Sequence, residues 1–189
     1  MVVYISCDIE TDGPIPNPYS MLQLGAAAFN PEGELLSTFT CNLEELPGGK
    51  KCEKTMNWWA QQNGLYEKTR ENMVSPLKAM ELFDAWVRDQ GAKPVFVGYP
   101  VAWDFSFVYW YLINYLDRSP FSHSALDIKT LAMVALNKDY RAVSKGSMPK
   151  EWFSEDKHSH VAVEDAIEQG RLFFKVLKAA RDITPQENR

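Results

Sequence analysis

Four acidic residues are best placed for chemistry in this sequence: Asp8, Glu10, Asp104 and Asp165. Asp8 and Glu10 follow the apolar run 2–7, whose length and β-branched content predict a buried strand. Side chains alternate along a strand, so residues two apart point to the same side and can share one cation. Two carboxylates at the end of a core element therefore predict a cation site.

Such carboxylates suit hydrolysis of a phosphodiester. Two Mg²⁺ or Mn²⁺ ions about 4 Å apart stabilise the charged in-line transition state and supply hydroxide near neutral pH. Magnesium prefers oxygen ligands and keeps several waters, so few carboxylates are needed for each ion. Four acidic side chains are therefore a reasonable set for two divalent metal ions.

Two of the acids also have ordinary structural interpretations. Asp104 lies where a helix is expected to begin, and its alternative interpretation is an N-cap. Asp165 falls in the first turns of a predicted helix, where the helix dipole favours a solvated acid. Its neighbours Ala162 and Ala166 indicate a close-packed face instead, whereas the adjacent Glu164 fits a solvated position.

Composition limits the remaining possibilities. The 189 residues fit a single domain, 1–189, with 46% hydrophobic residues for its core. No run approaches the ~20 apolar residues of a membrane span and no signal peptide is evident, so we expect a cytoplasmic protein with no membrane partner. Three cysteines without CxxC spacing disfavour a disulfide framework or a zinc site. The net charge of −5 argues against a broad basic nucleic-acid surface, but bound cations supply charge that composition omits.

Hydrophobic patterning predicts an α/β protein. An opening meander of three strands is followed by alternating helices and strands, which implies a mixed five-stranded sheet flanked by helices. The expected strands are 2–7, 21–29, 35–43, 94–99 and 125–128. The expected helices are 55–62, one after Pro76, 104–116, one ending at 136, and 160–181, with 140–159 mostly loop.

Three segments together resemble the DEDDh 3'-5' exonucleases, which have a ribonuclease H-like fold. They are Asp8-Ile9-Glu10-Thr11, the segment 97–105 (VGYPVAWDF), and the HxAxxDA motif of residues 160–166 (HVAVEDA). The second departs from the commoner form, which has asparagine where this chain has Pro100 and phenylalanine where it has Trp103. The segments 20–25 and 55–59 look closer to a branch that includes bacterial exoribonucleases and a phage exodeoxyribonuclease.

The resemblance implies a role for each residue of the motifs. Asp8 would bridge two metal ions, Glu10 and Asp165 would complete one, and Asp104 would hold the other. His160 would deprotonate the attacking water, and its unperturbed pKa near ~6.5 suits a base. His158 and His160 are not expected to bind metal as a pair, since imidazole is a poorer ligand than carboxylate for magnesium. His158 is the alternative base.

Substrate contacts are expected close to the first motif. Thr11 and Asp12 follow the metal-binding pair and are candidates to hold the 3'-terminal sugar, although a tight turn explains them equally. Of the adjacent pair Trp58 and Trp59, one is expected to stack on a base for ~1–3 kcal/mol, and Trp59 is the first candidate. The equal alternative is that both pack in the core. The loop 140–159 carries several cations, Lys145 among them, that could close over the scissile phosphate.

These observations predict a metal-dependent 3'-5' exonuclease that releases nucleoside monophosphates from single-stranded nucleic acid. RNA is slightly favoured over DNA by the branch resemblance, since the sugar is read through one 2'-hydroxyl. The alternatives are a catalytically silent nucleic-acid-binding module with the same fold, and a structural protein whose acids only cap helices and solvate surfaces. Relatives often form homodimers, so a homodimer is also an expectation.

Overall fold

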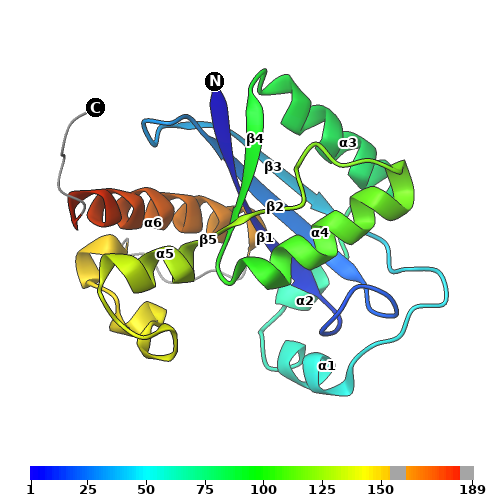
Figure 1. Cartoon of the computed structure of the whole chain (residues 1–189). Helices are drawn as coiled ribbons and strands as arrows, with labels where there is room; N and C mark the ends of the chain where they lie inside the picture. The colour runs from blue at the N-terminus through cyan, green and yellow to red at the C-terminus, as the bar shows by residue number, and fades with distance from the viewer. Residues whose placement is uncertain (154–160, 184–189) are drawn as a thin grey trace.

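The computed structural model describes residues 1–153 and 161–183. The sheet contains five strands in the order β3-β2-β1-β4-β5, as Figure 1 shows. Their bounds are β1 Val2–Thr11, β2 Met21–Phe29, β3 Leu35–Asn42, β4 Lys93–Gly98 and β5 Leu126–Asp127. β1 lies at the centre, antiparallel to β2 and parallel to β4. The mixed five-stranded sheet predicted from the sequence is confirmed.

Helices cover both faces of this sheet (Figure 1). The helices are α1 Glu53–Trp59, α2 Leu65–Lys68, α3 Pro76–Asp89, α4 Val101–Leu116, α5 Ile128–Ala135 and α6 Ala162–Ile183. α3 and α4 pack on one face and α5 and α6 on the other. None of the helices in the described residues is long and apolar enough to cross a membrane.

Side chains alternate along β1, so successive residues point to opposite faces of the sheet. Val3, Ile5 and Cys7 are fully or almost fully buried in the larger core beneath α3 and α4. Tyr4 lies on the other face, where its ring centroid is 5.1 Å from that of Phe173 on α6. Residues of even number on β1 therefore face α6, and this parity continues to the acidic positions of the strand.

Several boundaries differ from the sequence prediction. β1 runs through both of its carboxylates to Thr11, because pairing with β2 continues past the apolar run. α4 begins at Val101 with Pro100 as its N-cap residue, so the interpretation of Asp104 as an N-cap is wrong. The short helix α2 was not predicted, and the expected loop after α5 contains three 3-10 turns, η1 Tyr140–Ala142, η2 Lys145–Ser147 and η3 Lys150–Trp152.

Candidate active site

Three of the predicted metal ligands meet where β1 ends and α6 begins. Carboxylate oxygens of Asp8, Glu10 and Asp165 all lie within 4.8 Å of one another. Asp8 and Glu10 are both on the β1 side that faces α6, which places them opposite the first turn of that helix. An all-oxygen set at this spacing fits a hard divalent cation such as Mg²⁺ or Mn²⁺.

The start of α6 is fixed against the sheet by two glutamines and a glycine. The Gln23 side chain accepts a hydrogen bond from the Ala162 amide at 2.9 Å, so it pairs one of the amides that a helix leaves open at its start. The Gln169 side chain donates to the Cys7 carbonyl at 2.8 Å and to the Ser6 hydroxyl at 3.2 Å. A Cβ on Gly25 would overlap the backbone of Ala162, so only glycine permits this approach.

Asp104 reaches the same pocket from the first turn of α4. Asp104 is only 3% exposed, and the charge of Asp8 and then that of Glu10 act on its carboxyl group. Gly98 leaves the necessary room, since a Cβ there would lie 3.3 Å from the Asp104 Oδ2. The structure thus brings all four predicted carboxylates to one site, with Asp104 beside the closely spaced three.

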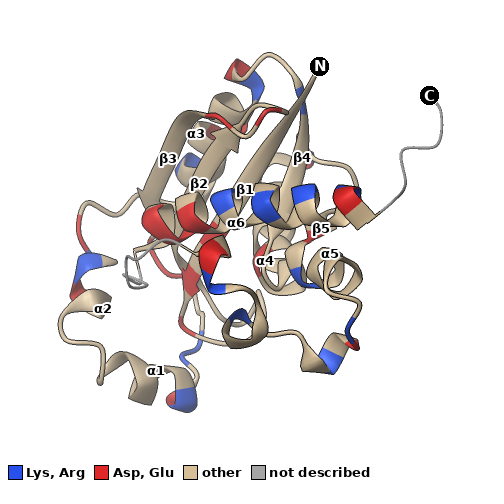
Figure 2. Ribbon diagram, turned by 90° about the vertical axis from the view of Figure 1, so that its left-hand side faces the viewer, with Lys and Arg blue, Asp and Glu red and all other residues tan. Residues whose placement is uncertain are grey.

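Burial and mutual repulsion raise the pKa values of Asp8, Glu10 and Asp104. Burial, and then the charge of Asp165, raise the pKa of Asp8 to about 8, although Lys145 opposes this. Burial and the charges of Asp8 and Asp165 raise the pKa of Glu10 to about 9. The pKa of Asp104 is raised well above its usual range, first by burial and then by Asp8. Figure 2 shows that acidic residues also mark the start of α6, with basic residues following along the helix.

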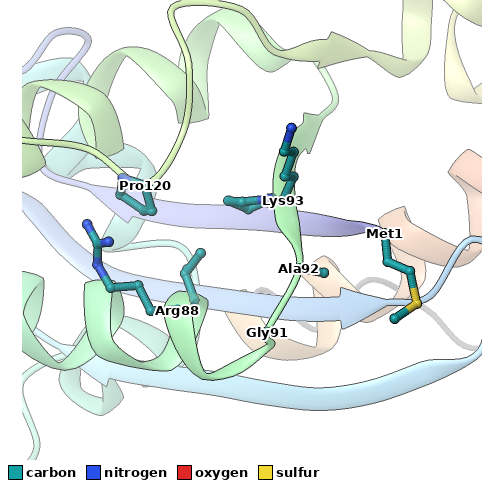
Figure 3. A pocket seen from close by; sticks show the side chains of 8 residues that line it. Met1, Arg88, Gly91, Ala92, Lys93 and Pro120 are labelled. Carbon is teal, nitrogen blue, oxygen red and sulfur yellow. The ribbon is translucent and has the colours of Figure 1, made fainter.

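The carboxylates line a hollow of about 280 Å³. Its wall also includes Lys145 from η2 and Trp103 from α4, whose side chain is 41% exposed. A larger hollow of about 470 Å³ lies elsewhere, around Met1, Arg88 and Lys93, as Figure 3 shows. Its lining contains no carboxylate side chain, so it does not offer comparable metal ligands.

Most of the residues predicted to contact substrate form hydrogen bonds within the protein instead. The Thr11 hydroxyl donates to the Gly13 carbonyl at 3.0 Å, and the Asp12 carboxylate accepts from the Ser20 amide. Both residues therefore brace the loop after β1, in line with the tight-turn alternative. Trp59 is 3% exposed and donates through its indole nitrogen to the Thr11 carbonyl at 2.9 Å, whereas Trp58 is 38% exposed. This arrangement favours Trp58, not Trp59, as the ring open to a base.

Both candidate bases, His160 and His158, lie outside the described residues, so the choice between them stays a prediction. The remainder of the third motif is described, and Ala162 and Ala166 are fully buried as the close-packed interpretation requires. Sequence reasoning did not identify Gln169 as part of the site. Its position one helical turn after Asp165, on the same face of α6, was the available signal.

Comparisons with known proteins agree with this geometry. The family model described as the 3'-5' exoribonuclease Rv2179c-like domain matches residues 3–177. The 3'-5' DNA exonuclease Cap18 of Escherichia coli is 32% identical over 176 residues, covering 90% of this chain and 89% of Cap18.

Solved structures extend the similarity to the fold. The nuclease domain of 3'hExo, a DEDDh family member bound to rAMP, has a TM-score of 0.71 at 11% identity, with 100% of this chain and 96% of that chain covered. Pop2p of S. pombe, in a form with Mg²⁺ and Mn²⁺ bound, has a TM-score of 0.69 at 14% identity, with 97% and 86% covered. The ribonuclease H-like fold predicted from the sequence is therefore confirmed. Together with the family match and the four converging carboxylates, these similarities show that the chain belongs to the Rv2179c-like family of 3'-5' exonucleases.

Proposed function

We propose that this exonuclease removes nucleoside monophosphates one at a time from the 3' end of single-stranded nucleic acid, using two divalent metal ions. The observation that carries the proposal is the convergence of Asp8, Glu10 and Asp165 within 4.8 Å, with Asp104 on the same hollow. A bound pair of Mg²⁺ or Mn²⁺ ions would supply hydroxide and stabilise the charge that develops on the phosphate. The four filled carboxylate positions argue against a silent binding module.

Each chain residue has a separate task in this proposal. Asp8 would contact both ions, while Glu10 and Asp165 would hold one of them. Asp104 reaches the hollow from α4 and would hold the other. His160 takes the proton from the attacking water, a role supported by the His-x-Ala pattern that leads into the described start of α6.

The comparisons do not agree on whether the substrate is RNA or DNA. The matching family is described as exoribonucleases, whereas Cap18 is named a DNA exonuclease. We propose RNA as the faster substrate, because the family description agrees with the branch resemblance in the sequence.

A time course with 5'-labelled single-stranded RNA and DNA of the same sequence tests the proposal. With Mg²⁺ or Mn²⁺ we expect a ladder that shortens from the 3' end, faster for RNA. Asp8→Asn and Asp165→Asn should abolish the ladder, because they keep side-chain volume but remove the ligand charge. Glu164→Gln, at an exposed acid beside Asp165, is the control and should leave the rate unchanged. Intact oligonucleotides under every metal, bound but uncut, would favour the binding module.

Two broader expectations also stand as proposals: a cytoplasmic location and a homodimer. The outer face of α4 supports the dimer, since Ile113 is 38% exposed and lines an apolar hollow with Tyr109 and Trp110. Light scattering on the purified protein gives its mass directly, and a mass near 21.6 kDa would contradict the dimer.

A further inference from the structure

One cation lies on the wall of the carboxylate hollow. Lys145 is the only basic side chain that lines this hollow among the described residues, and it faces four acids there. Its ammonium is also 5.7 Å from the centre of the Tyr99 ring, at the end of β4. A lysine in this position is either a counter-ion for the carboxylates or a ligand for an anion that enters the hollow.

The chain around Lys145 is built to hold it in place. The Ser144 amide donates to the Ser147 hydroxyl at 2.9 Å, and that hydroxyl donates to the Ala142 carbonyl at 2.8 Å. Val143 and Met148 anchor the two ends of this turn in the core, at 1% and 5% exposure. Lys145 therefore extends from a braced turn, so little backbone entropy is lost when its side chain binds a ligand.

The balance of charge favours the anion. Two divalent ions neutralise four carboxylates, so a counter-ion has no remaining task once the metals are bound. A phosphodiester then brings one further negative charge, and a lysine ammonium is a compact donor that suits a phosphate oxygen. We propose that Lys145 binds the phosphate of the scissile linkage and stabilises it through the reaction, an inference that rests on the proposed exonuclease function.

Kinetics and metal binding separate the two roles of the lysine. We expect Lys145→Ala to lower kcat/KM for a single-stranded oligonucleotide about 10²-fold at saturating Mn²⁺, and Lys145→Arg to recover part of the loss. The affinity for Mn²⁺ alone, measured by calorimetry, should stay the same or increase, because a like charge leaves the site. Lys150→Ala is the matched control, since Lys150 lies on the same segment in an exposed position and does not line the hollow.

A binding measurement without cleavage identifies the phosphate. We would compare an oligonucleotide with one that carries an uncharged methylphosphonate at its 3'-terminal linkage, in the presence of Ca²⁺. Lys145→Ala should weaken binding of the normal strand and leave binding of the methylphosphonate strand nearly unchanged. Equal losses for both strands, or a Lys145→Ala enzyme as active as Lys150→Ala, would overturn the inference. Failure of the wild-type enzyme to cleave any strand would instead overturn the proposed function.

Discussion

Asp8 and Glu10 are expected to differ in protonation state with and without a bound metal ion. Without a bound metal ion, burial and repulsion raise the pKa of Asp8 to about 8 and that of Glu10 to about 9, so below these values both side chains favour the protonated form. A divalent cation needs both carboxylates ionised, so it binds in exchange for protons. Metal affinity should therefore increase with pH across this range.

The same pKa values make the metal-free protein less stable at high pH. Between the ordinary pKa near ~4 and the raised values, the folded protein holds more protons than the unfolded chain, so its stability falls as pH rises. We expect the melting temperature in EDTA to fall from about pH 5 to about pH 9. Asp8→Asn with Glu10→Gln should flatten this slope, while Glu164→Gln should retain it. A melting temperature independent of pH in the wild type would contradict the raised pKa values.

The two neighbouring tryptophans should separate cleanly by mutation. Trp58→Ala removes an exposed ring, so we expect little change in stability and a KM for single strands roughly tenfold higher. Trp59→Ala removes a buried ring and its hydrogen bond to Thr11, so we expect a loss of about 3–5 kcal/mol in unfolding free energy. Urea unfolding and steady-state kinetics on both variants provide the measurement. A higher KM for Trp59→Ala alone would restore Trp59 as the stacking residue.

At the scale of elements, the sequence predicted the bounds of helices and strands better than the way they pack on one another. The strands β2 and β3 and the helices α3 and α6 were found close to their true bounds, because their apolar periods are strong. The start of α4 was missed by three residues, because Pro100 rather than Asp104 precedes the first turn. The closeness of α6 to β2 depends on Gly25, and no local pattern shows which backbone a glycine will admit.

This close approach predicts a strong effect of one methyl group. In Gly25→Ala the new Cβ would displace the first turn of α6, and with it Asp165. We expect Mn²⁺ affinity and kcat to fall at least tenfold while the protein still folds. Gly64→Ala is the control, since Gly64 has a positive φ and open space around it, so it should lose about 1 kcal/mol without loss of activity. Unchanged Mn²⁺ binding by Gly25→Ala would show that α6 does not depend on this contact.

At the scale of the whole molecule, the candidate site joins residues of β1 to residues of α6. The carboxylates come from β1, α4 and α6, so a cation that bridges them binds the folded state alone. Such a ligand stabilises a protein by mass action, by about 2.7 kcal/mol at a concentration one hundred times its Kd.

We therefore expect Mn²⁺ to raise the melting temperature at neutral pH by several degrees. Asp165→Asn should remove most of this increase, because it opens the link between α6 and β1. Differential scanning calorimetry with and without EDTA makes the comparison, and Glu164→Gln is again the control. An equal increase in Asp165→Asn would place the metal elsewhere.

The candidate site was predictable for the residues that carry a motif and not for those that the fold supplies. The three motifs identified every carboxylate, because the spacing of acids around strands and helix starts is visible in the sequence. Gln169 becomes part of the site only through packing, since tertiary contacts set its orientation. Lys145 was expected only as one of several cations on its loop, and packing decides that it is the one that lines the hollow among the described residues. His160 remains a prediction from its motif.

The distance along the chain between Asp8 and Asp165 has a consequence for synthesis of the protein. A ribosome completes β1 long before α6, so a growing polypeptide carries Asp8 and Glu10 long before Asp165. Until α6 has left the exit tunnel and packed on β1, the cluster of three carboxylates is incomplete. The order of the elements thus delays assembly of the candidate site until α6 has been synthesised and has packed on the sheet.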